Sequence, residues 1–179
     1  MWHEYRATAR NRVACIFSLI VLLGAVGEQV RADRPLSTAD ETSRLAELDA
    51  CWARVSRAVK EGDFDLYVST CHKDGVLVSG VQRQCYPLSK ALARWKQGFE
   101  DTKAGKIKAS VVFRFRQRLG DETTAHESGM FLYTATDADG KDIKKCVHFE
   151  ALLVKRDGWK IMMEYQKSKA TVEEWNALR

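Results

Sequence analysis

The sequence predicts an α+β domain in which three N-terminal helices cover a curved antiparallel sheet, with a short helix at the C-terminus. Two observations support this. Apolar residues recur at helical spacing through the first half of the domain, and then at alternate positions through the second half. Helices followed by a meander of strands are typical of a sheet with its helices on one face. The concave side of such a twisted sheet needs cover, which these helices can provide.

The first 32 residues have the order of a secretory signal peptide. Three arginines, Arg6, Arg10 and Arg12, precede an uncharged run over 13–27, and residues 30–32 fit the small-x-small cleavage pattern. A transmembrane helix needs about 20 apolar residues, so the run is short for a membrane anchor, although an uncleaved anchor stays the alternative. We therefore expect a secreted or periplasmic protein.

Cleavage of the leader leaves a linker over 33–40 and one domain over 41–179. The leader removes four arginines and two glutamates, so the formal net charge falls from +5 to +3. Nucleic-acid binding requires a clustered basic surface, which a modest net charge does not indicate. We expect no nucleic-acid partner, and no membrane association after cleavage.

Three helices are expected before the long strands. The first begins near Thr38, where Glu41 completes a capping box, and it ends at Gly62. Asp63 can cap a short second helix. The third follows Pro87. Its apolar side chains recur at helical spacing: Leu88, Leu92, Trp95 and Phe99.

The remaining segments alternate as strands do. A short hairpin is expected first, and four long strands follow the third helix. Asp-Gly pairs at 139–140 and 157–158 supply turns between long strands. A final helix begins at Thr171, with Glu174 completing its capping box. The expected strands are 75–79, 81–85, 107–116, 123–136, 145–155 and 159–166.

Two stretches within this element order are similar to a known superfamily. One is the helix-to-helix passage 58–67, with Gly62-Asp63 at the break, and the other is the last hairpin, 153–161, with its turn-Gly-Trp-Lys-Ile pattern. Both resemble the nuclear transport factor 2-like superfamily, especially its SnoaL-like and ketosteroid-isomerase-like branch. The resemblance implies a cystatin-like cone with a pocket between sheet and helices, and commonly a homodimer. Some members are isomerases, cyclases or dehydratases, whereas others only bind or assemble.

The isomerase branch implies three roles that can be tested on this sequence. Its phenol position falls near Val55, its acidic base near Ser79, and its protonated acid within 147–152. Valine cannot donate the oxyanion hydrogen bond, and serine is a poor base without a partner. Glu150 could fill only the last role. The sequence therefore argues against steroid-isomerase chemistry.

An imidazole and a carboxylate share one face of the strand over 145–155. His148 and Glu150 are two residues apart, so they could act as a base and its partner if that face lines the pocket. Phe149 and Leu153 share the opposite face. A sheet with one solvated face would place His148 and Glu150 outside, toward solvent or a dimer partner, and we favour this arrangement.

Seven other residues are expected to contribute to a ligand pocket. Five are aromatic residues on apolar faces, for which core packing is the simpler alternative, and two are polar residues within strands. They are Trp52, Tyr67, Trp95, Phe99, Phe113, Ser79 and Glu164.

Four cysteines follow the leader, and they allow three disulfide pairings. We favour Cys71 with Cys85, which flank the predicted hairpin, but buried free thiols fit the sequence equally well. The spacings of Cys51, Cys71, Cys85 and Cys146 match no zinc pattern, so no metal is expected.

An arginine stripe on the strand over 107–116 and beyond is a further feature. Arg114, Arg116 and Arg118 alternate, and they are expected on one face, paired with acids of a neighbouring strand or solvated. An anionic ligand or an acidic partner is the alternative.

The leading hypothesis is an exported domain that binds a small, mainly apolar molecule in a cone-shaped pocket as a homodimer. The first alternative is an isomerase, dehydratase or hydrolase of the same fold that uses His148 and Glu150. The second is an interaction domain that docks a partner through the sheet face. No cofactor is expected, because no phosphate loop, nucleophile elbow or dinucleotide fingerprint is present.

Overall fold

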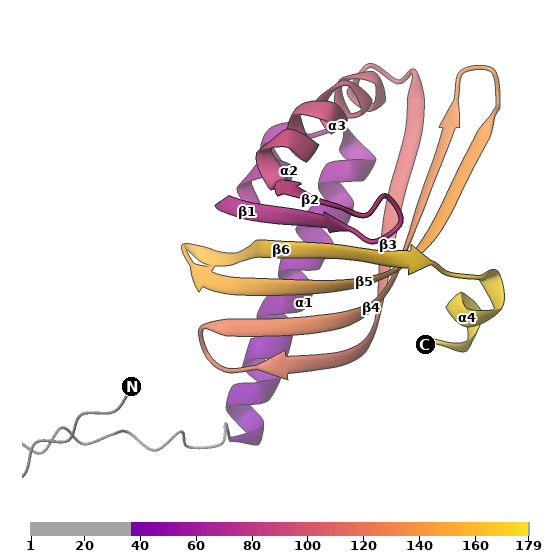
Figure 1. Cartoon of the computed structure of the whole chain (residues 1–179). Coiled ribbons are helices and arrows are strands. Elements are labelled where there is room, and N and C mark those ends of the chain that lie inside the picture. The colour runs from indigo at the N-terminus through magenta and orange to yellow at the C-terminus, as the bar shows by residue number, and fades with distance from the viewer. Residues whose placement is uncertain (1–36, 179) are drawn as a thin grey trace, which may run out of the picture. The chain divides into compact units, whose positions relative to one another are not determined.

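The computed structural model describes residues 37–178. The predicted signal peptide lies outside the described residues. Figure 1 shows the arrangement of the elements. They are, in chain order, α1 (Thr38–Glu61), α2 (Phe64–Ser69), β1 (Cys71–Ser79), β2 (Gln84–Pro87), α3 (Leu88–Lys103), β3 (Ile107–Gly120), β4 (Thr124–Asp137), β5 (Asp142–Arg156), β6 (Gly158–Lys169) and α4 (Val172–Ala177).

The strands form one curved, unclosed sheet in the order β2-β1-β6-β5-β4-β3 (Figure 1). The helices α1 and α3 pack against one face, which we call the inner face, and α2 packs on both of these helices. The short α4 lies on the outer face, where the Trp175 ring contacts the Arg114 guanidinium. The predicted α+β class, with three helices covering a curved sheet and a short C-terminal helix, is confirmed.

One strand pair differs from the predicted antiparallel meander. The long strands β3 to β6 pair antiparallel in sequence order, but β1 runs parallel to β6. The sheet is therefore mixed. Parallel neighbours need a long crossover, and here the chain from α3 through β5 separates β1 from β6. Alternation along a single strand reports its faces and not the direction of its neighbour, so the sequence pattern could not reveal this pair.

Local signals place most helix ends well. Asp63 accepts a hydrogen bond from the Leu66 amide and caps α2, and Thr171 with Glu174 forms the predicted capping box of α4. The box of α1 is one residue earlier than predicted, because Ser37 and Asp40 form it. Gly62 ends α1 with a φ of 67°, as expected for a left-handed cap.

The first hairpin is offset relative to its prediction. The strand β1 begins at Cys71, and β2 pairs only with its last four residues, so Cys85 lies opposite Val78. Seven steps of strand separate Cys71 from Val78, which is about 20 Å, whereas bridged Cα atoms lie within about 7 Å of each other. The Cys71–Cys85 disulfide prediction is therefore wrong, and the four cysteines of the described residues are free thiols.

The predicted arginine stripe is broken by an irregularity in β3. The β3–β4 register shifts between Phe115 and Gln117. Arg114 consequently lies on the outer face, while Arg118 lies on the inner face, where it pairs with Glu127 and with Asp49 of α1. A bulge turns the following side chains to the other face, so the expectation of a single face is wrong. The expected pairing with an acid of the neighbouring strand holds for Arg118.

The core fills the space between α1 and the inner face. Leu48, Val55 and Ala58 of α1 are buried against Phe149 and Leu153 of β5, whose alternation was visible in the sequence. Burial of each such side chain contributes about 1.5–3 kcal/mol. The core closes over only part of the inner face, and the remainder borders a cavity.

Candidate functional site

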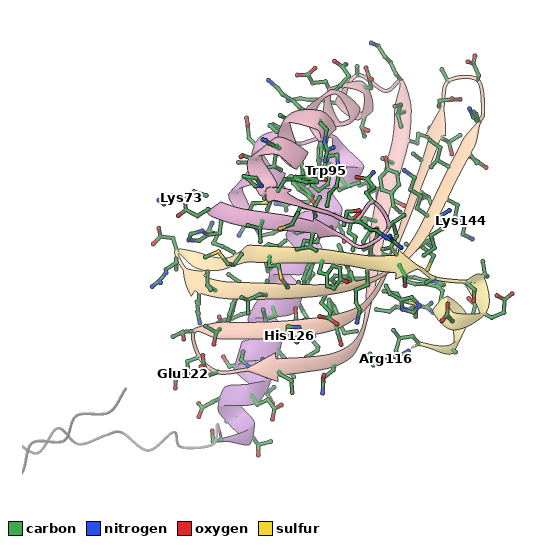
Figure 2. The ribbon with its side chains drawn as sticks, viewed as in Figure 1. Lys73, Trp95, Arg116, Glu122, His126 and Lys144 are labelled. Carbon is green, nitrogen blue, oxygen red and sulfur yellow. The ribbon has the colours of Figure 1, made fainter. Side chains whose placement is uncertain are left out.

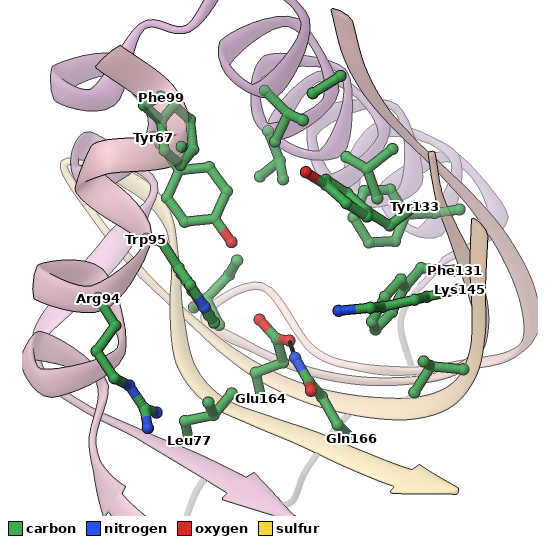
Figure 3. A pocket seen from close by; sticks show the side chains of 18 of the residues that line it. Tyr67, Leu77, Arg94, Trp95, Phe99, Phe131, Tyr133, Lys145, Glu164 and Gln166 are labelled. Carbon is green, nitrogen blue, oxygen red and sulfur yellow. Dashed lines mark hydrogen bonds between the residues drawn. The ribbon is translucent and has the colours of Figure 1, made fainter. Parts of the chain in front are cut away.

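A cavity of about 500 Å³ lies between α1, α2 and α3 and the inner face of the sheet (Figure 3). It occurs because the strands curve away from the helices beyond the end of the packed core. The volume is within the range of roughly 300–1,000 Å³ that is typical of small-molecule sites.

Aromatic and branched side chains form most of the cavity wall. Trp52 of α1 packs on Phe113 with ring centroids 4.5 Å apart, and Tyr67 of α2 packs on Phe99 at 5.0 Å. Trp95 reaches from α3 into the space between the helices and the strands (Figure 2). Such rings present rigid apolar area to a guest at little cost in conformational entropy.

A polar group projects from β6 into this apolar wall. Glu164 and Gln166 face the cavity, and Gln166 Nε2 donates a hydrogen bond to Glu164 Oε1 over 2.7 Å (Figure 3). Burial raises the pKa of the Glu164 carboxyl above its ordinary value, and the hydrogen bond from Gln166 opposes this in part. The carboxyl can accept a hydrogen bond from a guest, and can donate one when protonated.

Phenol and cationic groups add to the polar lining, to which Ser79, Gln82, Tyr86 and Thr102 also contribute. The hydroxyls of Tyr67 and Tyr133 and the amine of Lys145 point into the cavity, and Arg94 lies on its α3 side (Figure 3). Burial raises the pKa of both phenols, with the Glu164 charge adding to the effect at Tyr67. Both phenols therefore stay neutral hydrogen-bond donors at physiological pH. The cavity thus combines an apolar body with several separated polar contacts.

All seven residues that the sequence suggested for a ligand pocket border this cavity: Trp52, Tyr67, Ser79, Trp95, Phe99, Phe113 and Glu164. The structure brings them together from α1, α2, β1, α3, β3 and β6. Their placement is established by the fold, whereas their role in binding stays a prediction.

His148 and Glu150 lie elsewhere. They occupy the outer face of β5, and neither lines the cavity. His148 Nε2 is 3.2 Å from Glu174 of α4, and Glu150 accepts a hydrogen bond from Lys167 over 2.7 Å. The Lys167 partner lowers the Glu150 pKa, which suits a solvated ion pair and makes the carboxylate a weaker base. Catalysis in the pocket would require both side chains to converge on the cavity, and neither of them lines it.

The isomerase positions fall on the cavity wall but carry no suitable groups. Val55 and Ser79 line the cavity, and the only residue of 147–152 that lines it is Val147. Among residues 37–178, the one carboxyl that lines it comes from β6, at Glu164, a position that the isomerase pattern does not use. This placement agrees with the argument against steroid-isomerase chemistry.

A buried ionic network holds the Trp52 wall in place. Glu127 is fully buried, and it accepts hydrogen bonds from the Trp52 indole and from Arg118. Arg118 also binds Asp49 one helical turn before Trp52. Because the indole nitrogen is tethered, the Trp52 ring presents a fixed face to the cavity.

No cluster of three or more His, Cys, Asp or Glu side chains within residues 37–178 has the placement to hold a metal ion. No helix in that part of the chain is both long and apolar enough to cross a membrane.

Several cavity residues escaped the sequence reasoning, among them Arg94, Tyr86 and Lys145. Lys145 could have been found, because it shares the alternating face of Val147 and Phe149 on β5. Arg94 and Tyr86 gave no signal, since their place depends on how β2 packs against α3.

Comparison with known proteins identifies relatives of this domain. The sequence model of the calcium/calmodulin dependent protein kinase II association domain matches residues 44–171, which includes every element from most of α1 through β6. A search of curated proteins finds no match.

Solved structures share the fold at low sequence identity. A conserved protein from Planctomyces limnophilus has a TM-score of 0.60 and 14% identity, over 69% of this chain and 94% of that one. A ketosteroid isomerase-like protein from Erwinia carotovora atroseptica has 0.53 and 19%, over 72% and 97%. An NTF-2-like protein from Shewanella oneidensis has 0.53 and 16%, over 68% and 97%. These similarities agree with the predicted superfamily and concern the fold alone.

Proposed function

The chain belongs to the calcium/calmodulin dependent protein kinase II association domain family, and on the basis of its cavity we propose that it binds a small, mainly apolar molecule. The observation that supports this most is the cavity itself. About 500 Å³ bordered by aromatic rings, with a few convergent polar groups, is the usual architecture of a small-molecule site.

The distribution of polar groups suggests how the guest is oriented. A hydroxyl or carbonyl group of the guest would meet Glu164, Gln166 and Tyr67, while its apolar body would lie on the aromatic wall. A polar group buried without a partner is costly, so the three side chains favour a guest that carries one such group over a pure hydrocarbon.

Gly98 offers a clean test of cavity binding. It lines the cavity from the middle of α3, and a Cβ atom built on it meets no atom within 4 Å. Replacing this helical glycine by alanine should stabilise the domain by about 0.5–1 kcal/mol. Gly98 is exposed, so it lies at the open side of the cavity. Gly98→Trp should therefore fold, and its ring should cover the opening through which a guest enters.

The experiment titrates a neutral aromatic probe, phenylnaphthylamine, against the mature chain. We expect wild type and Gly98→Ala to bind it similarly, and Gly98→Trp to lose at least about tenfold in affinity. Equal affinity of all three proteins would contradict binding in the cavity. Circular dichroism and urea unfolding of Gly98→Trp check that the variant is folded.

We also propose a homodimer that uses the outer face of the sheet. Val112, Leu119 and Leu152 on that face are between about a third and a half exposed, and Leu119 and Leu152 lie on either side of His126 in the sheet. The family description as an association domain favours the same idea. Sedimentation equilibrium should give a dimer that Leu119→Glu weakens, and a monomer at every concentration would refute it.

Export is the last part of the proposal. Its support is the order of basic, apolar and small residues in the first 32 positions. Expression of the full chain in a secreting host should yield a product whose N-terminus is Asp33, and a product that retains Met1 in the cytosolic fraction would contradict export.

A further inference from the structure

A shallow groove adjoins the cavity where β2 meets α3. Two of its residues, Tyr86 and Arg94, border the cavity as well, so the groove and the cavity adjoin at these two side chains. The groove is lined by Arg83, Gln84, Cys85, Tyr86, Lys90, Ala93 and Arg94.

The groove is basic, and no carboxylate of the described part of the chain lines it. Arg83, Lys90 and Arg94 are its charged residues, and none of them forms a salt bridge with another residue of 37–178. The cavity adds Lys145 and Glu164. Together the two spaces therefore present four cations and one carboxyl. Such a concave surface of one sign attracts and retains anions.

Arg94 is fixed at the junction of groove and cavity. Its guanidinium lies over the Tyr86 ring at 4.6 Å from the centroid and donates a hydrogen bond to the Tyr86 hydroxyl. A guanidinium has five N–H donors, and this contact leaves most of them available. The stacking limits the conformations of the side chain, so less entropy is lost when an anion binds.

Arg83 shows an unusual backbone in the same groove. It has a φ of 54° in the turn between β1 and β2, and it is the only described residue other than glycine with a positive φ. A glycine would adopt this left-handed conformation without steric cost. Non-glycine residues held in this conformation cluster at functional sites, and here the side chain adds a cation to the groove.

We propose that the groove binds an anionic group, so that the ligand is an amphiphilic anion with its apolar body in the cavity and its acidic group between Arg83, Lys90 and Arg94. The assignment of the apolar body rests on the proposed function. The anion site is an independent property of the groove, and the experiment separates the two.

The first measurement compares two probes that share an aromatic body. Anilinonaphthalene sulfonate carries an anion, and phenylnaphthylamine does not. The double variant Arg83→Gln/Lys90→Gln should weaken the anionic probe about fivefold more than it weakens the neutral probe. Raising NaCl from about 20 to about 500 mM should weaken the anionic probe selectively as well. Lys73→Gln, which removes one exposed lysine at the opposite end of β1, is a single-charge control remote from the groove and should change this ratio less than about twofold.

The second measurement needs no guest in the cavity. Cys85 is exposed and lies in the groove, whereas the other three described cysteines are buried or half-buried. Its rate with the dianionic reagent dithiobis(nitrobenzoate), divided by its rate with neutral dithiodipyridine, reports the local potential. The double variant should lower this ratio severalfold, and Lys73→Gln should leave it near the wild-type value.

The outcomes are distinguishable. A selective loss of the anionic probe together with a lower reagent ratio supports the proposal. Equal losses for both probes, or a reagent ratio that the double variant does not change, overturns it. If neither probe binds wild type, the proposed function fails for these guests, and the Cys85 ratio alone then decides for or against the anion site.

Discussion

Removal of the Arg118 side chain should destabilise the domain far more than removal of the Glu127 charge, although the two residues form one ion pair. Glu127 is fully buried, and Arg118 is the only cation paired with it among residues 37–178, with the Trp52 indole as its other partner. Arg118 has a second acid, Asp49, at 2.5 Å on the surface of α1. Arg118→Met therefore leaves a buried carboxylate uncompensated, whereas Glu127→Gln leaves Arg118 paired and keeps an acceptor for the indole.

The expected magnitudes follow from these partners. Breaking a buried ion pair by removing one member costs about 3–5 kcal/mol, and we expect about 3 kcal/mol for Arg118→Met, because one of its nitrogens already has no partner. Glu127→Gln exchanges one charged hydrogen bond for a neutral one and should cost about 1 kcal/mol. For a domain of this size, about 3 kcal/mol lowers Tm by roughly 10 °C.

Urea unfolding followed by tryptophan fluorescence measures both variants. The matched control is Lys155→Met, which removes a cation from the partly exposed Lys155–Glu47 pair and should cost less than about 1 kcal/mol. Combining Arg118→Met with Glu127→Gln should cost less than the sum of the two single changes. The reasoning is refuted if Glu127→Gln is as damaging as Arg118→Met, or if Arg118→Met behaves like the surface control.

Three further predictions concern the glycine that ends α1, the cavity carboxyl of Glu164 and the buried thiols. Gly62→Ala should destabilise the domain by more than about 2 kcal/mol, because its Cβ would lie 2.3 Å from the Lys103 backbone nitrogen. Gly105→Ala, which has a similar φ and no atom within 4 Å of its Cβ, should cost only about 1 kcal/mol. Equal losses of stability in urea unfolding would contradict the close approach of Gly62 to Lys103. Glu164→Gln should stabilise the domain increasingly as pH rises. The pKa of the Glu164 carboxyl is raised in the folded state, so the carboxyl ionises first in the unfolded state, and wild type loses stability as pH rises above the unfolded-state pKa. Urea unfolding of both proteins at about pH 4 and about pH 8 tests this, and a stability difference between variant and wild type that does not change with pH would refute it. Burial raises the pKa of the Cys51 and Cys71 thiols to about 11 and about 12. Iodoacetamide should therefore modify Cys85 long before either of them, which mass spectrometry of a digest measures. Early modification of Cys51 would contradict the packing of α1.

The strands show what a single sequence can and cannot predict. On β5, the alternation of Phe149 and Leu153 with His148 and Glu150 correctly separates the two faces, since the pleat fixes this period. The same reasoning on β3 placed Arg114 and Arg118 together, and failed because a bulge between Phe115 and Gln117 changes the face. Bulges depend on the neighbouring strand and leave no mark in the alternation.

The candidate site was likewise predictable from the sequence only in part. Trp52, Trp95 and Phe99 were predictable as cavity residues, because apolar faces of covering helices must point to the inner face of the sheet. The basic groove was not predictable, because it arises from the packing of β2 against α3 and from the offset hairpin that places Arg83 beside α3. Chain distance along the strands, and not residue type, also decided against the Cys71–Cys85 bridge.

The most direct measurement is native mass spectrometry of the chain from residue 33 onward, purified without added ligand and then compared with Gly98→Trp prepared in the same way. The account predicts a small non-protein mass that dissociates from wild type and is missing from the variant. Wild type that carries only its own mass, or the same adduct on both proteins, would contradict a guest in the space between the helices and the sheet.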